Sequence, residues 1–205
     1  MLASDRFGST TGFEWQTALP TLTSRSVTLR EPVAQDVGAL VDLLSIADAS
    51  RFGLDYPVTE FAVHDFIERV QRDREAGAAV TYVVLINPGR TVAGAFQVRR
   101  LDPMFEAAEW EATLAPSARG TGVFVEAARL VGSFAFGTLG AHRLEARVLL
   151  QNGRANSALR KLGAVQEGVL RRSARRGGEY VDQVLWSVLK DDWTENWVST
   201  EPRVH

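Results

Sequence analysis

The chain has 205 residues, of which 45% are hydrophobic and 23% are charged, and its formal net charge is −2 at pH 7. These proportions are typical of a soluble globular protein with a sizeable core, and the small net charge excludes a general affinity for nucleic acid or anionic lipid. No cysteine is present, which excludes disulfides, thiolate metal sites and a cysteine nucleophile. The histidines at positions 64, 142 and 205 lack ligand spacing, so we expect no metal site.

Both ends of the chain differ in pattern from its middle. Residues 1–22 show no clear period and are expected to form an N-terminal arm, and 194–205 are expected to form a tail. Residues 23–193 are expected to form a single domain. Neither a signal pattern nor an apolar run of membrane-spanning length is found, so we expect a cytoplasmic protein without membrane association.

Apolar periodicity and turn residues divide the domain into alternating elements. In chain order they predict a strand at 26–31, helices at 36–46 and 59–76, strands at 80–86, 91–98 and 107–114, a helix at 122–139, a strand at 142–150, a short helix at 156–162 and strands at 164–171 and 180–189. This order predicts a mixed α/β domain of the α+β type. Its mostly antiparallel sheet has about seven strands flanked by about four helices, with parallel pairing possible across the helix at 122–139.

One stretch has the order of strand, glycine turn and helix. The strand ending at Leu114 is interrupted by Pro116, the turn reads Arg119-Gly120-Thr121-Gly122, and helical spacing begins at Val123. Such a turn presents backbone N–H groups and a helix N-terminus to one point, where a phosphate or pyrophosphate is favoured. A plain connecting turn is the alternative. The missing third glycine and the absence of Gly-Lys-Ser/Thr argue against a dinucleotide fingerprint and a Walker loop.

Three polar residues are candidates for catalysis. Glu109 and Glu111 are two apart on a predicted strand, so they share a face, and either could act as a general base. An exposed strand face is the alternative. Asn152 follows the strand at 142–150 and is either a ligand-binding amide or the stabiliser of an Asx turn.

Arginines and aromatic residues mark two further features. The segment 171–178 joins the last two strands and carries Arg171, Arg172, Arg175 and Arg176. A solvated hairpin tip is favoured, while an acidic substrate or RNA is the alternative, and an association with the ribosome or with nucleic acid rests on this segment alone. The aromatic residues Phe13 and Trp15 are expected to dock on the body or a second subunit, and Trp193 and Trp197 to pack the tail.

Taken together, four segments resemble the GNAT superfamily of N-acetyltransferases, nearest to the branch that includes bacterial ribosomal-protein N-terminal acetyltransferases. They are Leu29-Arg30-Glu31-Pro32 with Asp36; Arg119-Gly120-Thr121-Gly122 with Glu126-Ala127; His142-Arg143-Leu144-Glu145-Ala146 with Asn152, Lys161-Leu162-Gly163-Ala164 and Glu167-Gly168; and Asp182 with Trp186 and Trp193. The likeness covers about residues 24–193.

The resemblance implies a GNAT-like fold, acetyl-CoA as co-substrate and acetyl transfer to a primary amine by direct attack on the thioester. The acceptor would be a protein N-terminus, a lysine or a small amine, and a homodimer is possible by analogy. The catalytic candidates are Glu109, Glu111 and Asn152. The expected contacts of acetyl-CoA are Leu114, Ala115, Arg119, Gly120, Thr121, Gly122, Val123, Phe124, Asn152, Asn156 and Lys161.

Three positions depart from the family pattern. Phe124 stands where the loop normally has Gly or Ala, and it either presses on the cofactor or faces the core. Ala155 replaces a serine that could protonate the thiolate, and Ala174 lies near the place of a glutamate in the ribosomal branch. These departures motivate an alternative function, a catalytically weak acyl-CoA-binding sensor or structural protein.

Overall fold

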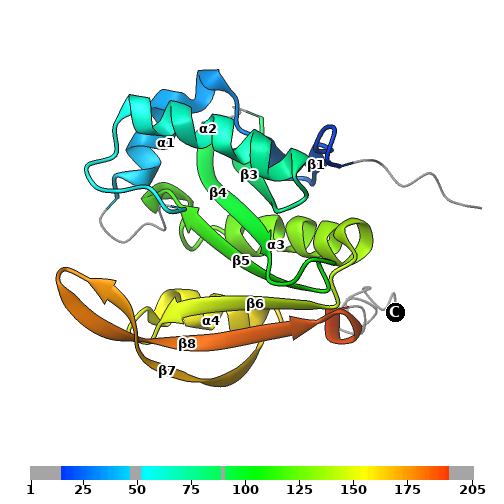
Figure 1. Cartoon of the computed structure of the whole chain (residues 1–205), viewed down its shortest axis with the longest axis vertical. Coiled ribbons are helices and arrows are strands. Elements are labelled where there is room, and N and C mark those ends of the chain that lie inside the picture. Colours follow the sequence, from blue (N-terminus) through cyan, green and yellow to red (C-terminus); the bar gives the residue numbers. More distant parts are fainter. Residues whose placement is uncertain (1–14, 47–51, 89–90, 194–205) are drawn as a thin grey trace, which may run out of the picture.

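A single eight-stranded sheet forms the centre of the computed structural model, which describes residues 15–46, 52–88 and 91–193 (Figure 1). The strands lie in the order β1-β2-β3-β4-β5-β6-β8-β7, and all neighbours are antiparallel except β5 and β6. They are β1 (Leu22–Thr23), β2 (Val27–Arg30), β3 (Ala79–Ile86), β4 (Thr91–Arg100), β5 (Ala107–Leu114), β6 (Arg143–Leu149), β7 (Val165–Arg176) and β8 (Glu179–Leu189). The α-helices are α1 (Val37–Leu44), α2 (Glu60–Glu75), α3 (Val123–Phe134) and α4 (Gly153–Lys161).

This architecture confirms the predicted mixed, mostly antiparallel fold, including the parallel pair across the helix that follows β5. The additional strand is β1, whose two residues are too few to show an alternating pattern. The segment 171–178 was wrongly predicted as a joining loop, because β7 continues to Arg176 and only Gly177 and Gly178 form the turn. The hydrophobic pattern of a sequence indicates which side chains are buried, not which backbones pair. Strand β7 lies at the edge of the sheet with almost every residue exposed, so it shows no such pattern.

The two largest differences between predicted and observed helix boundaries have local reasons. Helix α4 begins at Gly153, three residues early, because the Asn152 side chain accepts the N–H of Ala155 and caps the first turn. Helix α3 ends at Phe134, and the chain continues as a π-helical turn over Ala135–Leu139. Gly140 then ends the helical segment in the left-handed region at φ 85°, as its position in the sequence predicted.

The helices lie in two layers, one on each face of the sheet (Figure 1). On one face, Leu40 of α1 and Phe66 of α2 pack with Val83 of β3. On the other face, Tyr82 of β3 meets Phe134 of α3 edge to face, with 5.8 Å between the ring centroids. Successive side chains of a strand point to opposite faces, so Tyr82 contributes to the core on one face and Val83 to the core on the other. Strand β3 is therefore buried on both faces.

Aromatic residues fasten both described ends of the chain to the domain. Trp193 is 5% exposed, packs against Trp110 and Phe136, and donates its Nε1–H to Ser133 Oγ at 3.3 Å, which confirms that this tryptophan packs the tail. Trp15 meets Phe105 edge to face and so docks on the body. Phe13 and Trp197 lie outside the described residues, and the division into arm, domain and tail stays a prediction. Within the described ranges, no helix has the length and hydropathy needed to cross a membrane.

Candidate functional site

Strands β5 and β6 are paired at one end and diverge at the other. Their ladder runs from Ala107↔Arg143 to Glu109↔Glu145. Beyond this point β5 stays paired to β4 as far as Gly94↔Leu114, whereas β6 stays paired to β8 as far as Leu149↔Gln183. Each strand thus follows its antiparallel partner, so the sheet opens between them (Figure 1). This opening leaves an edge of β5 available to a ligand.

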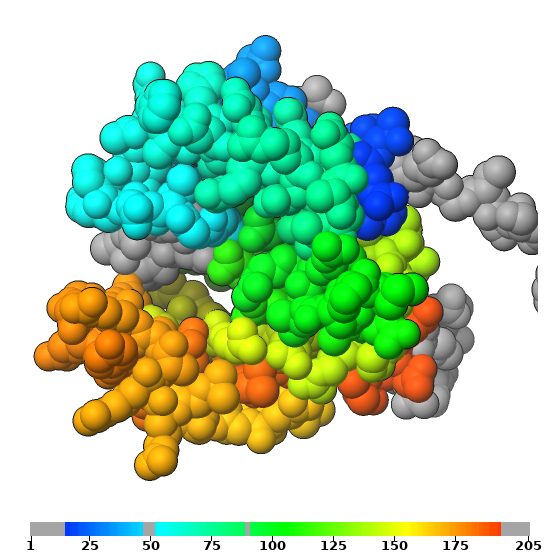
Figure 2. Space-filling model, viewed as in Figure 1, coloured from blue at the N-terminus to red at the C-terminus, as the bar shows by residue number. Residues whose placement is uncertain are grey.

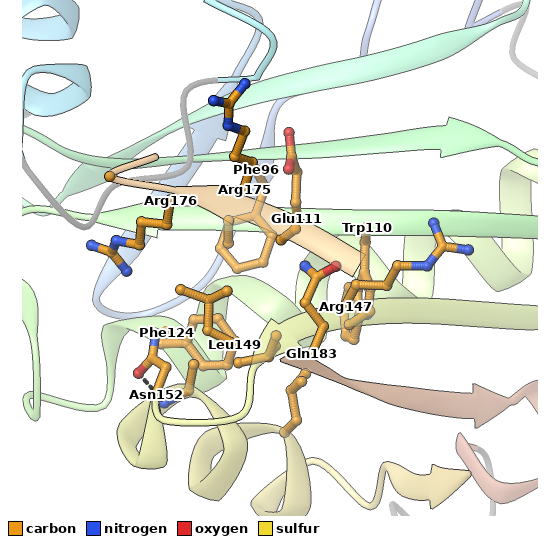
Figure 3. A pocket seen from close by; sticks show the side chains of 17 residues that line it. Phe96, Trp110, Glu111, Phe124, Arg147, Leu149, Asn152, Arg175, Arg176 and Gln183 are labelled. Atoms are coloured by element: carbon orange, nitrogen blue, oxygen red, sulfur yellow. Dashed lines mark hydrogen bonds between the residues drawn. The ribbon is translucent and has the colours of Figure 1, made fainter. Parts of the chain in front are cut away.

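A cavity of about 680 Å³ lies in this opening. In Figure 2 a hollow separates the cyan and green part of the surface from the orange β7–β8 hairpin. The cavity draws its lining from β4, β5, the start of α3, β6, the start of α4 and the hairpin (Figure 3). A second cavity of about 450 Å³ adjoins it and shares Trp110, Glu111, Arg147 and Gln183 with the first. The opening is large enough for a small ligand, by comparison with typical binding clefts of 300–1,000 Å³.

The glycine turn lies between the end of β5 and the start of α3, so the predicted order of strand, turn and helix is confirmed. Gly120 has φ 80° and Gly122, the N-cap of α3, has φ 90°. Both positions favour glycine because side chains rarely adopt this conformation. Arg119 Nε donates to the Leu114 carbonyl at 3.1 Å and Thr121 Oγ1 donates to the Ala118 carbonyl at 2.7 Å, which closes the turn internally.

Helix α3 begins directly after this turn, at Val123. The amides of a helix's first turn have no acceptor within the helix, and they carry the positive end of its dipole. The predicted contacts from Leu114 to Phe124 therefore come from one continuous segment that ends at the cavity, with Phe124 itself in the lining. Such a segment can bind an anion through its backbone.

The structure settles how Phe124 is oriented. Its ring stacks on Phe96 of β4, with 5.6 Å between centroids and 28° between planes, and both rings line the first cavity. Phe124 is partly buried and packs against the α3-side core. Its ring is therefore held in place by the core and forms an apolar wall of the cavity. This supports the alternative in which Phe124 faces the core, while its contact with the cofactor stays a prediction.

Glu109 and Glu111 share one face of β5, as predicted, because they are two residues apart on a regular strand, and both border the second cavity. Their surroundings differ. The Glu109 side chain is 11% exposed and is held by two guanidinium groups, that of Arg99 on β4 and that of Arg147 on β6, the latter at 3.0 Å. Glu111 is exposed and lines both cavities. Both oxygens of Glu109 are thus engaged in ion pairs, whereas Glu111 lies where a ligand would reach it.

Ion pairs continue from Glu109 across β6 to β7. Arg143 Nε lies 2.9 Å from Glu145, and the same guanidinium binds both oxygens of Glu167 at 2.7 and 2.5 Å. Ser187 Oγ donates to Glu167 at 2.6 Å. The hydrogen bonds from Arg143 and Ser187 lower the pKa of the Glu167 carboxyl to about 2. This network stabilises the sheet face that α1 and α2 leave uncovered.

Asn152 and Asn156 both have structural roles in the first turn of α4. Asn152 Oδ1 accepts the N–H of Ala155 at 3.1 Å, and the residue also lines the first cavity. Asn156 is 9% exposed; its Nδ2 donates to the carbonyl oxygens of Leu149 and Asn152, and its Oδ1 accepts the indole N–H of Trp186 at 2.8 Å. The expected contact between Asn156 and the cofactor's phosphates is not supported by this geometry, because its polar atoms bind within the protein.

Other residues of the cavities were not assigned to the site from the sequence, and Arg175 and Arg176 were noted only as part of the basic segment 171–178. Gln183 of β8 and Arg147 of β6 line both cavities, and Arg175 and Arg176 line the first. The alternation of Arg143, Glu145 and Arg147 predicted a strand with one polar face. It did not predict which other strands or which cavity this face would contact. Arg160 stacks over Trp186, with 5.5 Å from its guanidinium carbon to the ring centroid. Lys161 is the exposed last residue of α4 and lies outside the cavity lining.

Comparison with protein families gives a match that covers the site. The model of the acetyltransferase (GNAT) domain matches residues 26–165, which is more than half of the chain. This range includes β5, the glycine turn, α3 and the whole of α4. The match therefore covers the strands between which the cavity lies.

Individual relatives agree with the family match. The chain is 24% identical over 176 residues to "Uncharacterized N-acetyltransferase p20" of Bacillus licheniformis, covering 85% of this chain and 99% of that protein. It is 36% identical over 73 residues to "Probable N-acetyltransferase YjcK" of Bacillus subtilis, a match that spans only 40% of that relative. Among solved structures, Mycobacterium smegmatis RimJ in complex with CoA-disulfide superimposes with a TM-score of 0.76 at 18% identity, covering 88% of this chain and 92% of that chain.

Proposed function

Because the chain belongs to the GNAT family of N-acetyltransferases, which use acetyl-CoA, we propose that it transfers the acetyl group directly to a primary amine bound in the opening between β5 and β6. The observation that carries this proposal is the cavity of about 680 Å³ in that opening, bounded by the start of α3 on one side and by Glu111 on the other. The acceptor amine and the thioester would meet there.

The glycine turn suits the pyrophosphate of acetyl-CoA. The backbone amides from Gly120 to Phe124 would donate to its oxygens, because Gly122 caps α3 in the left-handed region and nothing lies within 4 Å of the place where its Cβ would be. The Arg119 N–H already donates to the Pro116 carbonyl at 3.2 Å, so Arg119 would contact the pyrophosphate through its side chain. The pantetheine arm would lie along the edge of β5 near Leu114 and Ala115, where β6 has moved away. Lys161 remains a proposed contact of the phosphates, and the amide NH₂ of Asn152 a donor to a bound ligand at the cavity wall.

Glu111 is the preferred candidate for the general base. Glu111 lines both cavities whereas Glu109 borders only the second, so Glu111 is the carboxylate better placed to take a proton from an ammonium group in the cavity. The amine nitrogen would attack the thioester carbonyl, so that a C–N bond forms, the C–S bond breaks and the electron pair leaves with sulfur. Ala155 lines the cavity but has no hydroxyl, so the thiolate would take its proton from solvent.

A comparison of matched variants tests both parts of this proposal. Glu111→Gln is expected to lower kcat by about 10²- to 10⁴-fold, as loss of a general base does, with unchanged affinity for acetyl-CoA. Glu109→Gln should act mainly on stability, because it breaks two ion pairs. Calorimetry on Gly122→Trp should find no acetyl-CoA binding, and Gly122→Ala, which shares the backbone strain but adds little bulk, controls for folding.

The possible results separate the two functions considered for this fold. Turnover that depends on Glu111 supports an acetyltransferase with this base. Acetyl-CoA binding without turnover of any amine would instead favour the acyl-CoA sensor. Tight binding that survives Gly122→Trp would refute the proposed pyrophosphate site.

A further inference from the structure

The walls of the two adjoining cavities carry an excess of positive charge. Four arginines line them, Arg99, Arg147, Arg175 and Arg176, against the two carboxylates Glu109 and Glu111. An amine acceptor is itself cationic before it loses its proton. A site with this charge balance repels a simple cation, unless the acceptor brings a negative group of its own.

The arginines differ in how far their charge is already used. Arg99 and Arg147 bind Glu109, and Arg147 also lies 3.7 Å from Glu145, so these four residues neutralise one another. Arg175 is exposed near the tip of the β7–β8 hairpin, and among the described residues no ion-pair or hydrogen-bond partner of its side chain is found. In Figure 3 the side chains of Arg175 and Glu111 point toward the same side of the opening. The cavity therefore presents a carboxylate and an uncompensated guanidinium to one ligand.

We propose that the acceptor is a primary amine that carries a carboxylate, with its ammonium group at Glu111 and its carboxylate at Arg175. This inference rests on the proposed acetyl transfer and specifies its substrate class. A guanidinium binds a carboxylate through a planar pair of N–H donors, which lysine or a neutral side chain cannot reproduce. Polyamines, which carry only positive charges, fit this wall poorly.

Two sources could supply such an acceptor, a free amino acid or the N-terminus of an acidic peptide. The assay uses two matched pairs, glycine with glycinamide and Asp-Gly-Gly-amide with Asn-Gly-Gly-amide, and spermidine as a polycation. The measured quantity is the ratio of kcat/KM for the acidic member to that for the neutral member. Comparing this ratio between wild type and variant cancels the difference in amine pKa within each pair.

Arg175→Ala is expected to reduce the ratio about threefold to fivefold, the upper part of the range found for exposed ion pairs, through KM rather than kcat. Arg175→Glu should reduce it further, and higher salt should reduce the wild-type ratio. Arg171→Ala is the matched control, because Arg171 is exposed on the same strand but borders neither cavity. The pair that shows the effect identifies the source of the acceptor.

The opposite results are equally definite. An unchanged ratio in Arg175→Ala, an equal fall in Arg171→Ala, or a preference for spermidine would overturn the acidic acceptor while leaving acetyl transfer in place. No turnover with any of the five amines would overturn the proposed acetyl transfer and, with it, the acidic acceptor.

Discussion

Replacing Asn156 with alanine separates a structural role of this residue from the cofactor contact that the sequence led us to expect. The carboxamide holds the start of α4 to the end of β6 through the carbonyl oxygens of Leu149 and Asn152, at 3.1 and 2.9 Å. Its Oδ1 also accepts the indole N–H of Trp186, a residue that is 2% exposed. Alanine removes all of these contacts at once and leaves the indole donor without its partner.

The magnitude follows from the groups left behind. An unsatisfied buried donor costs about 1–3 kcal/mol and each lost neutral hydrogen bond about 0.5–1.5 kcal/mol, so Asn156→Ala should cost about 3 kcal/mol of unfolding free energy. For a chain of this length, 1 kcal/mol lowers Tm by about 2–4 °C, which predicts a fall of about 6–12 °C. Acetyl-CoA affinity measured well below Tm should stay near the wild-type value.

Differential scanning calorimetry and acetyl-CoA titration, run on the same preparations, measure both quantities. Ser157→Ala is the matched control, since Ser157 is the next residue of α4 and is exposed. A wild-type Tm combined with acetyl-CoA binding about tenfold weaker, a loss of about 1.4 kcal/mol, would refute the structural role and restore Asn156 as a cofactor contact.

Two further predictions concern packing and acid stability. Gly132→Ala should lower the free energy of unfolding by about 1–3 kcal/mol despite the better helix propensity of alanine, because the added Cβ would lie 2.6 Å from the buried ring of Trp193. Thermal melts measure this loss. Gly137→Ala is the control, because a Cβ at Gly137 would meet nothing within 4 Å. The pKa of Glu167 is lowered from 4.5 to about 2, chiefly by its hydrogen bonds from Arg143, so its ion pair stabilises the fold above pH 4.5 and loses this effect as pH falls toward 2. Glu167→Gln should therefore lower Tm at pH 7 and flatten the decline of Tm between pH 4.5 and 2, and a variant that matched wild type at pH 7 would contradict this role.

Local signals were sufficient to predict β5, the glycine turn and α3. Pro116, Gly120 and Gly122 separate an alternating strand pattern, which ends at Leu114, from a helical pattern, which begins at Val123. The structure has the strand, the turn and the helix at these positions. The limits of β5 agree residue for residue with the predicted 107–114, because both of its ends adjoin strong turn signals. Where the boundary depends on a side chain that accepts a backbone N–H of the first helical turn, as Asn152 does from Ala155, the apolar pattern starts too late and the prediction fails.

Long-range pairing was the part that the sequence could not supply. Residues 171–176 carry no strand pattern, since an edge strand exposed on nearly every residue has no buried side to mark. Their backbone nevertheless pairs with β8, resuming at Ala174↔Val181 after a register shift. That pairing, and not the local sequence, brings Arg175 to the cavity opposite Glu111.

The choice between Glu109 and Glu111 illustrates the same limit within a single strand. Their spacing puts both on one face, and nothing in their immediate sequence distinguishes them. The distinction arises from two other strands, because the β4 register places Arg99 opposite Glu109 and the parallel β6 supplies Arg147 at 3.0 Å. Beyond Glu109 the two strands diverge, so Glu111 lies at the wall of both cavities. The splay that opens a space for the cofactor is therefore also what differentiates the two carboxylates. A substitution that extended the β5–β6 ladder by one pair would be expected to impair both features together.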